Sequence, residues 1–435
     1  MRKIIPLLIG LNSIFTVQSQ EVQKSEENQV HNHCGFDHSK QNQLTISGFV
    51  DERQQLELFT KTFSESEKTT IIIPVVFHIN KSSSPTQVTL QQIQSAIDIL
   101  NEDYSAQNTG FSSVRPEFQT IAANIGIQFC LAAIDPNGNP TTGVTYHTNS
   151  FDGREPDDMG TTIKTLSGWP GNKYLNVWTT RDPAGTGDVY QSGWAFLPYT
   201  PYVNQGVDGI IYNDKYLGKY GTGASAFNDP TNAHMCHVLS HEVGHYLNLD
   251  HTFENYCASP GDNVSDTPPV YYYGSGNCEQ IGTKCPGVTL VNDENYMDYT
   301  ECPKMFTNGQ KTRMLATLNS TTAFRKNLWS TNNLIATGCS VGSNGIDELS
   351  LNDVIKISPN PSNGMFEVTL NSIQIDDFYI EILDVTGRII AQETCEKVVG
   401  KKTINFSLSN VNPGIYNCVI TTVKNGRIVK RMVIE

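Results

Sequence analysis

Apolar positions in the middle of the chain follow two different periods. Residues 70–79 form an almost unbroken β-branched run, which predicts a buried strand. In residues 87–104 apolar side chains recur every three or four positions, which predicts an amphipathic helix. Residues 69–338 are therefore expected to form one α+β domain. The same reasoning predicts a helix over 231–247, with Thr231 or Asn232 as its N-cap, and strands over 126–132, 174–179, 194–197 and 209–212.

After residue 350 the pattern changes to short apolar runs separated by turn sequences such as Pro-Asn-Pro and Asn-Gly. Short strands at this spacing predict a small all-β sandwich over residues 351–435. Residues 339–350 carry no such pattern, and we interpret them as a linker. The expected strands are 355–357, 365–370, 378–385, 403–408, 415–423 and 428–434.

The beginning of the chain divides into two parts. Arg2 and Lys3 precede an apolar stretch, and we expect residues 1–19 to be a signal peptide cleaved after Ser19, with a buried strand or helix as the alternative. Residues 20–68 are polar, rich in Gln and Glu and without clear periodicity, and we interpret them as a pro-segment. No later stretch reaches the ~18 apolar residues that span a membrane, so a secreted or surface-attached protein is expected.

Composition narrows the classes of function. The formal net charge of -14 argues against a general nucleic-acid binder, which needs a basic face. Export permits disulfides among the ten cysteines. The four cysteines within residues 257–302 are expected to form two local disulfides, for which three pairings are possible. The sequence leaves the pairing of the following cysteines open: Cys130, Cys236, Cys339, Cys395 and Cys418.

The strongest chemical signal is a histidine motif in the predicted helix 231–247. His241 and His245 are four residues apart, so both face one side of the helix and can share one zinc ion. Glu242 completes the H-E-x-x-H pattern and can act as general base on a water whose pKa the zinc lowers to about 7. His251 can be the third ligand if the chain turns back, and Asn248 at that turn tolerates the left-handed conformation.

The alternative is an ordinary amphipathic helix that carries histidines by chance. His237 precedes His241 by four residues, but Val238 rather than a carboxylate follows it. We therefore interpret His234 and His237 as packing or supporting residues. Structural roles are also expected for three more residues: His78, His147 and Cys236, the last as a buried thiol or disulfide partner.

The extended motif over residues 241–251 resembles that of the metzincin clan of zinc endopeptidases, with Asn248 where the clan usually has Gly. Asn295-Tyr-Met-Asp-Tyr299 resembles the methionine turn of that clan, with Met297 as the turn methionine. This phrase, together with His251-Thr-Phe253 and residues 261–268 and 302–310, resembles the pappalysin family, in particular its bacterial ulilysin- and cytophagalysin-like members. The resemblance covers roughly residues 70–330.

The resemblance implies a metzincin-like fold, in which a twisted mixed sheet with helices lies above an irregular lower subdomain and a cleft separates the two. Trp194, Ala195 and Phe196 would belong to an edge strand that pairs with an extended substrate. Tyr299 would stabilise the oxyanion, with a packed core tyrosine as the alternative. Met297 would form an apolar floor without a chemical role.

The resemblance also implies calcium, disulfides and a substrate preference. Asp262 and Thr267 fall on positions that bind calcium in family members, although a loop whose acidic residues cap backbone NH groups would look the same. Glu301 would lie near the base of the pocket for the residue after the scissile bond, which implies a preference for Arg or Lys there. The implied disulfides cross one another and join Cys257 to Cys285 and Cys278 to Cys302.

Two further resemblances concern latency and export. Cys34, followed by Gly35, resembles the cysteine switch of metzincin zymogens, in which the thiolate fills the open zinc position; a disulfide or an unpaired thiol is the alternative. The C-terminal module resembles the sorting domain of type IX secretion in Gram-negative bacteria, through residues 359–364, 384–387, 413–416 and 430–433. A carbohydrate- or protein-binding sandwich is the alternative. We therefore expect export through the periplasm, with the secretion machinery as a partner.

The leading hypothesis is a secreted zinc endopeptidase, made as a latent zymogen, that hydrolyses internal peptide bonds of proteins. A second hypothesis is a surface adhesin whose protease-like domain only binds. A third is a zinc hydrolase that acts on a bond other than a peptide. The natural substrate, the maturation sites and the oligomeric state stay open.

Overall fold

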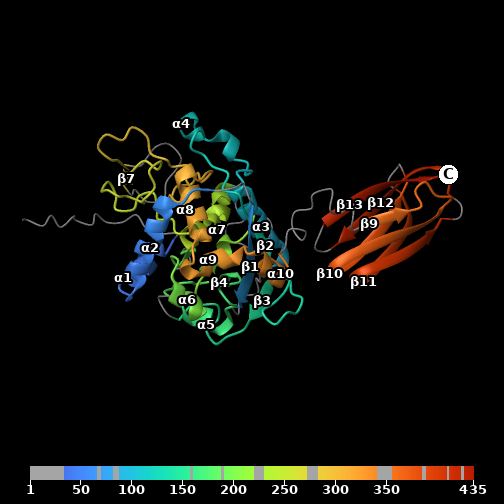
Figure 1. Cartoon of the computed structure of the whole chain (residues 1–435), viewed down its shortest axis with the longest axis horizontal. Helices are drawn as coiled ribbons and strands as arrows, with labels where there is room; N and C mark the ends of the chain where they lie inside the picture. Colours follow the sequence, from blue (N-terminus) through green and yellow to red (C-terminus); the bar gives the residue numbers. More distant parts are fainter. Residues whose placement is uncertain are drawn as a thin grey trace, which may run out of the picture.

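The computed structural model of the protein has a main body of helices and strands and a β-rich part at the C-terminal end of the chain (Figure 1). We call residues 34–65 the N-terminal segment, residues 70–339 the main body and residues 355–435 the C-terminal module. The structure describes residues 34–65, 70–81, 88–156, 160–187, 191–219, 230–271, 283–339, 355–384, 388–408, 411–422 and 426–435. The predicted signal peptide lies outside these residues.

A six-stranded mixed sheet organises the main body, as the sequence predicted. Its strand order is β2-β1-β4-β6-β5, and β3 pairs with β1. All pairings are parallel except that of β5, which runs antiparallel to β6 at one edge. The strands are β1 (Ile71–Asn80), β2 (Ile127–Leu131), β3 (Val144–His147), β4 (Leu175–Thr180), β5 (Gly193–Ala195) and β6 (Ile210–Asn213).

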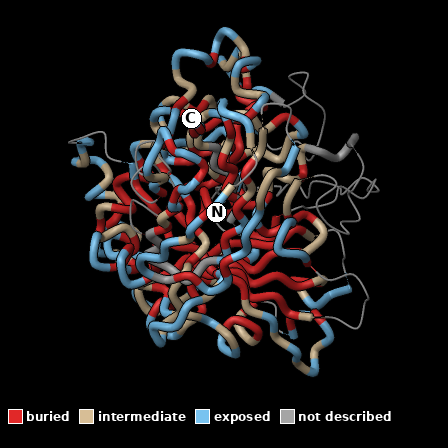
Figure 2. The backbone as a smooth tube through the Cα atoms, turned by 90° about the vertical axis from the view of Figure 1, so that its right-hand side faces the viewer, coloured by how far each residue is buried: buried red, intermediate tan, exposed pale blue. Residues whose placement is uncertain are grey.

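Helices α3 (Leu90–Tyr104) and α7 (Val238–Tyr246) pack together against the core of this sheet. Thr89 caps α3 by accepting a hydrogen bond from the Gln92 backbone. The buried strands and helices lie inside, whereas exposed residues follow the outer turns (Figure 2). The other helices of the main body are η1 (Phe111–Ser113), α4 (Pro116–Gln119), α5 (Thr162–Ser167), α6 (Thr200–Asn204), η2 (Asp214–Tyr216), α8 (Asn308–Asn319), η4 (Thr322–Phe324), α9 (Arg325–Leu328) and α10 (Thr331–Thr337).

The predicted α-helix over residues 231–247 is wrong in its first half. Residues 230–237 form a 3-10 helix, η3 (Pro230–His237), and the N-cap of α7 is His237 rather than Thr231 or Asn232. The His237 ring pairs with the buried Asp103 at 2.8 Å. A tertiary contact of this kind overrides local helix propensity, which the sequence alone cannot weigh.

The N-terminal segment contains two helices that the sequence analysis did not predict, α1 (Phe36–Leu44) and α2 (Phe49–Thr62). Each buries only a few side chains, with Phe36 and Phe49 as the large apolar ones. The sparse apolar positions explain why no periodicity was visible. Helix α1 lies against β5, and α2 lies against α8.

Disulfides fasten the lower, irregular part and the end of the main body. Cys257 is bonded to Cys285, as the family resemblance implied. Cys302 is also disulfide-bonded, but its implied partner Cys278 lies outside the described residues. The two short strands here are β7 (Val270–Tyr271) and β8 (Thr283–Lys284).

A further disulfide, which the sequence left open, joins Cys130 on β2 to Cys339. Cys339 is fully buried and so belongs to the packed main body rather than to the predicted linker. Among the residues that the structure describes, the free cysteines are Cys34, Cys236, Cys395 and Cys418.

The C-terminal module is all-β, as predicted, with its own apolar core. The predicted strands 365–370 and 378–385 are one long strand, whose pairing with β11 shifts register between Ser372 and Phe378. β9 pairs with the first part of this strand and β12 with its last part. The strands are β9 (Ile355–Ser358), β10 (Met365–Leu383), β11 (Ile389–Ser407), β12 (Gly414–Thr422) and β13 (Gly426–Ile434).

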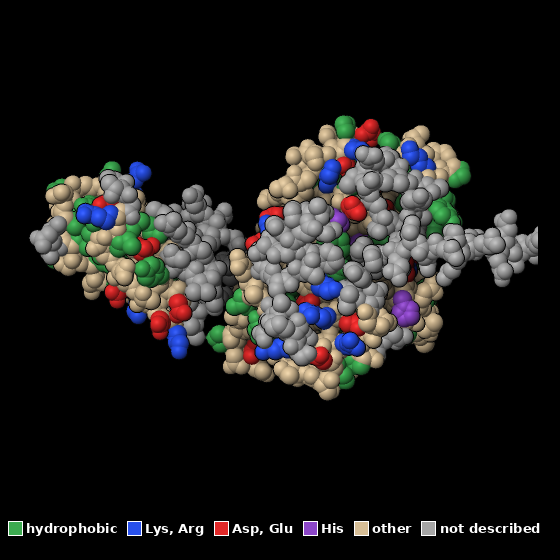
Figure 3. All heavy atoms as spheres, turned by 180° about the vertical axis from the view of Figure 1, so that it is seen from behind, with side chains coloured by type: hydrophobic (Ala, Val, Ile, Leu, Met, Phe, Trp, Pro, Cys, Tyr) green, Lys and Arg blue, Asp and Glu red, His purple; other side chains and the backbone are tan. Residues whose placement is uncertain are grey.

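Charged side chains of both signs are interspersed over the face seen in Figure 3. Within the described residues, no helix combines the length and the apolar character needed to cross a membrane.

Candidate metal centre and its cleft

Helix α7 and the turn after it bring three histidines together. The His245 Nε2 atom lies 3.0 Å from His241 Nε2 and 3.2 Å from His251 Nε2. Asn248 makes the turn that returns His251 to the helix, with φ of 73°, as the sequence predicted for this position. The Leu249 N–H closes this turn by donating a hydrogen bond to Gly244 O at 2.9 Å.

The second ring nitrogen of each histidine is held by an oxygen. Nδ1 of His241 contacts Tyr296 O at 2.6 Å, and Nδ1 of His245 contacts Leu249 O at 2.7 Å. Nδ1 of His251 contacts Asp37 Oδ1 of the N-terminal segment at 3.1 Å. Such bonds fix the ring and leave Nε2 to a metal. Burial lowers the pKa of His241 to about 3, and a metal-ligating imidazole has to be neutral in this way.

Cys34 joins the three histidines as a fourth buried donor. One ligand atom from each of these residues lies within 4.8 Å of all the others. The Cys34 Sγ atom is 3.9 Å from His245 Nε2. In tetrahedral zinc, bonds of about 2.0–2.1 Å to nitrogen and about 2.3 Å to sulfur place neighbouring donors roughly 3.3–3.6 Å apart. The donor types therefore suit zinc, and the observed separations of 3.0, 3.2 and 3.9 Å lie on both sides of this range.

Glu242 lies beside this cluster in a fully buried position. Its Oε2 accepts a hydrogen bond from the Ala195 backbone on β5 at 3.1 Å. Burial raises the pKa of Glu242 to about 8. A carboxyl group with a raised pKa next to a metal cluster is typical of a general base.

Met297 forms the floor under α7, as the family resemblance implied. It is fully buried, and a Cβ on Gly244 would lie 2.4 Å from its sulfur. Only glycine leaves room for this contact between the helix and the methionine turn.

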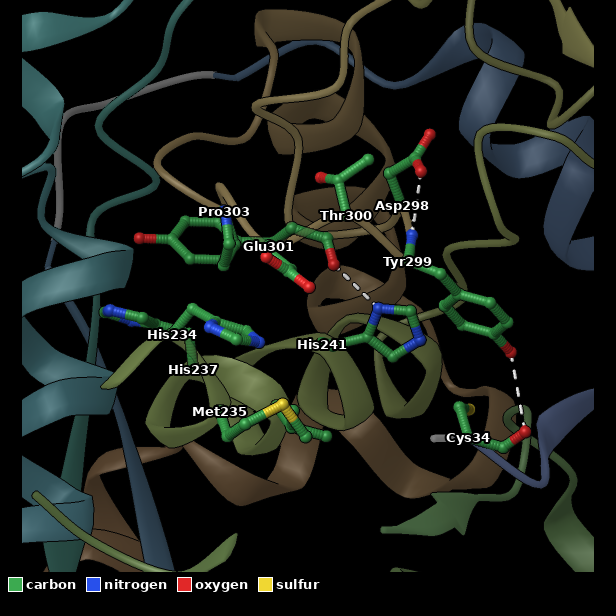
Figure 4. Close-up of a pocket in the computed structure, with 12 residues that line it drawn as sticks. Cys34, His234, Met235, His237, His241, Asp298, Tyr299, Thr300, Glu301 and Pro303 are labelled. Carbon is green, nitrogen blue, oxygen red and sulfur yellow. Dashed lines mark hydrogen bonds between the residues drawn. The ribbon is translucent and has the colours of Figure 1, made fainter. Parts of the chain in front are cut away.

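Tyr299 points toward the cluster, and its hydroxyl donates to the Cys34 carbonyl at 3.4 Å (Figure 4). Its ring lies 4.7 Å from that of His251 and 5.7 Å from that of His241. The tyrosine therefore lies beside the histidine cluster, and its ring also packs against Phe253.

A pocket opens beside His241 between η3, the start of α7 and residues 296–303. Met235 and Val238 give it an apolar wall, and the Glu301 side chain is directed into it (Figure 4). His234 and His237 also line the pocket, and neither belongs to a group of potential metal donors among the described residues. Asp103 raises the pKa of His237 to about 10, against the effect of burial, which lowers it.

The edge strand β5 faces the N-terminal segment. The Gly35 N–H donates to Gly193 O at 2.8 Å. The side-chain amide of Gln43 donates to Leu197 O at 3.3 Å and accepts from Leu197 N at 3.2 Å. Backbone groups on this edge are thus paired as an extended peptide would pair them. Trp194, Ala195 and Phe196 are buried beneath this cover.

Ion pairs hold the same segment beside His251. Lys40 Nζ lies 2.8 Å from Asp250 Oδ1, and Arg53 pairs with the other oxygen of this buried carboxylate. The guanidinium of Arg313 pairs with both oxygens of Glu57. Arg53 and Lys40 lower the pKa of Asp250, although its burial acts in the opposite direction.

The predicted calcium residues are adjacent and buried. The Thr267 hydroxyl lies 2.8 Å from Asp262 Oδ1 and 2.8 Å from Val264 O. Burial raises the pKa of Asp262 to about 7, although the hydrogen bonds from Thr267 and Val264 act in the opposite direction. Oxygen donors of this kind suit calcium.

Sequence reasoning missed the contacts that the N-terminal segment makes with the site. Asp37 and Gln43 carry no motif of their own, and their partners lie more than 150 residues away. The only signal was the position of Asp37 three residues after Cys34. His78 is structural as expected, because it bonds to Thr145 and Asn176 within the sheet.

Comparison with known proteins identifies the chain. Residues 160–319 match the peptidase M43 family described as Pregnancy-associated plasma protein-A, and residues 356–435 match the Secretion system C-terminal sorting domain. An extracellular metalloprotease of Sordaria macrospora is 30% identical over 292 residues, which cover 66% of this chain and 87% of the relative. One of Neurospora crassa is 30% identical over 284 residues, covering 61% and 85%.

Solved structures agree with these relatives. Mature mirolysin of Tannerella forsythia, in complex with a cleaved peptide, is 30% identical with a TM-score of 0.54, over 62% of this chain and 98% of that one. A promirolysin variant is 28% identical with a TM-score of 0.57, over 68% and 95%.

The fold and the matched relatives define a metalloendopeptidase, and this class implies a zinc cofactor. The chain belongs to the pappalysin family of metalloproteases. It is made as a zymogen, and its sorting domain marks it for export by type IX secretion.

Proposed function

We propose that this chain is a secreted zinc endopeptidase in which His241, His245 and His251 hold the catalytic metal and Glu242 is the general base. One observation carries the proposal. The His245 Nε2 atom lies 3.0 Å from His241 Nε2 and 3.2 Å from His251 Nε2, and Glu242 is buried beside these rings. Zinc bound there would supply a Lewis acid and lower the pKa of the attacking water.

Two side chains would then carry out the proton transfer and the stabilisation of the oxyanion. Glu242 takes a proton from the attacking water and later gives it to the leaving amine, which a carboxyl of raised pKa can do. Tyr299 donates its hydroxyl hydrogen to the oxyanion of the tetrahedral intermediate. Its place above His241 and His251 supports this role.

The substrate would lie along β5 in an extended conformation. The backbone groups of Gly193 and Leu197 that bond to the N-terminal segment are the ones a peptide would use. The residue after the scissile bond would enter the pocket beside His241. Because Glu301 lines this pocket, we propose a preference for Arg or Lys at that position.

Latency would come from the N-terminal segment, which belongs to a pro-segment over residues 20–68 behind a signal peptide over residues 1–19. Cys34 would occupy the open position of the metal and exclude water. The catalytic domain, predicted over residues 69–338, would extend to Cys339, which is bonded to Cys130, and would be followed by a linker and the sorting module from residue 351. The Cys34 sulfur within reach of all three histidines supports the switch.

A calcium ion at Asp262 and Thr267 would stabilise the lower part of the molecule. The buried carboxylate of Asp262 carries no ion pair among the described residues, and a divalent cation would compensate its charge. Calcium removal by a chelator should then lower the melting temperature of the parent but not that of Asp262→Ala.

The experiment that tests the function is digestion of an unfolded protein by the processed enzyme and by Glu242→Ala, with mass spectrometry of the products. Cleavage by the parent alone is the expected result, with Arg or Lys after the cut bonds. No cleavage by a folded, zinc-loaded parent would overturn the proposal in favour of a binding module. Apolar residues after the cut bonds would contradict only the role of Glu301.

A further inference from the structure

One of the three metal-site histidines is held by a residue that leaves on activation. His241 and His245 use the carbonyl oxygens of Tyr296 and Leu249, which belong to the main body. His251 instead uses Asp37 of helix α1, at 3.1 Å. Removal of the N-terminal segment, which we propose activates the enzyme, therefore deprives His251 Nδ1 of its hydrogen-bond partner.

A second carboxylate stands next to this histidine. Glu254 follows His251 by three residues, in a turn closed by a 3.0 Å hydrogen bond from Glu254 N to His251 O. One oxygen of Glu254, one oxygen of Asp37 and one ring nitrogen of His251 lie within 4.8 Å of one another. The Glu254 carboxylate therefore already lies near the ring, and a side chain of this length can change its position by changing rotamer.

The N-terminal segment also engages Glu254 in the precursor. Lys40 Nζ lies 2.7 Å from Glu254 Oε1, so the carboxylate is paired with a cation of the segment. Lys40 and Asp37 are neighbours on α1, so both leave together. The same cut that deprives His251 of its carboxylate thus frees another carboxylate beside it.

Two other carboxylates near His251 have charged or hydrogen-bonding neighbours in the main body. Asp298 accepts hydrogen bonds from the Thr252 hydroxyl and the Tyr299 backbone. Asp250 pairs with Lys40 and Arg53 of the segment. When the segment is removed, the positive charge of Arg313 in the main body remains near Asp250. Glu254 is the main-body carboxylate that forms a group with Asp37 and the His251 ring, and the cation that pairs with it, Lys40, belongs to the segment.

We propose that Glu254 replaces Asp37 as the hydrogen-bond partner of His251 Nδ1 in the mature enzyme. The ring then bonds to one carboxylate before activation and to another after it. Glu254 is a positioning residue: it fixes the tautomer and orientation of His251 and raises its basicity as a ligand. The inference rests on the proposed zinc site.

The test is the zinc affinity of precursor and mature enzyme, measured by competition with a chromogenic chelator. Mature enzyme is prepared from the full-length precursor by cleavage at a protease site inserted between residues 64 and 70. Glu254→Ala should weaken zinc binding of the mature enzyme by about tenfold or more and that of the precursor by less than about twofold. Glu254→Gln, which keeps an acceptor oxygen, should fall between the parent and Glu254→Ala in the mature enzyme.

Asp37→Asn provides the reciprocal control. It should weaken zinc binding of the precursor, whereas the mature enzyme made from it should match the parent, because residue 37 is then absent. Parent-like zinc affinity of mature Glu254→Ala overturns the inference. Equal losses in both forms also overturn it, because they indicate a general structural role. A parent that binds no zinc refutes the proposed metal site instead.

Discussion

The two parts that flank the main body are held by different forces. The N-terminal segment buries few apolar side chains and is fastened by charged contacts, among them Lys40 and Arg53 on Asp250 and Glu57 on Arg313. The C-terminal module has a continuous apolar core of its own, in which Val368, Ile380 and Ile382 are fully buried.

From this difference we expect the N-terminal segment to dissociate once it is cut and the C-terminal module to fold on its own. A segment that depends on partners in the main body loses its order once it is cut and diluted. A module with its own core keeps its fold whether or not the catalytic domain is active. Four predictions test this contrast, from the largest expected effect to the smallest.

The largest effect is expected from Ile380→Ala in the module core. Loss of a fully buried isoleucine should lower the free energy of unfolding of the module by about 2–5 kcal/mol, measured by chemical denaturation. Peptide cleavage by the main body should not change. Ile389→Ala, whose side chain is 49% exposed, is the matched control and should lower the unfolding free energy by less than about 1 kcal/mol. Equal losses would contradict an independent core.

Cys34→Ala should give a precursor that cleaves peptides without processing. If the thiolate contributes about 3 kcal/mol to latency, activity should rise by roughly 10²-fold over the parent precursor. Cys236→Ala removes another free cysteine of the main body and should stay latent. An inert Cys34→Ala precursor that binds zinc would show that the polar contacts alone maintain latency.

Glu57→Gln should weaken the hold of the segment on the main body. It removes the charge from two hydrogen bonds to the buried Arg313, so the inhibition constant of a peptide spanning residues 34–65 should rise by about tenfold. Glu65→Gln is the control. Its pair with Lys311 spans 3.3 Å at the surface, and its loss should change inhibition by less than about twofold.

The smallest effect is expected from removal of residues 351–435. The catalytic rate of the processed enzyme should stay within about twofold of the parent, because no residue of the module belongs to the described metal cluster. A large loss of activity with an unchanged melting temperature would show that the module contributes to the cleft.

Much of this architecture could be predicted because its signals are local. The spacing of His241, His245 and His251 placed three imidazoles on one side of a helix and its following turn, and the structure shows Asn248 in the left-handed conformation. The strands of the sheet followed from β-branched runs, since a strand buried on both faces carries apolar side chains throughout. The sorting module followed in the same way from short runs between turns.

The elements that were missed or wrongly predicted from the sequence share one cause. Helices α1 and α2 have too few apolar positions to show a period, and they are ordered by contacts with β5 and α8. The first half of the helix predicted over 231–247 is a 3-10 turn in a segment tied to Asp103 through His237. In both cases partners far away in the chain decide the local structure.

By itself, the sequence determined the metal ligands that we propose, the turn that gathers them and the division into a mixed α+β domain and a β-sandwich. Those features depend on residue types at fixed short spacings, which backbone geometry converts directly into positions. Only the tertiary structure decided that Cys130 bonds to Cys339, that Gln43 pairs with Leu197 and that Asp37 holds His251. Each of these contacts joins residues more than 150 positions apart, and the packing of the whole chain selects them.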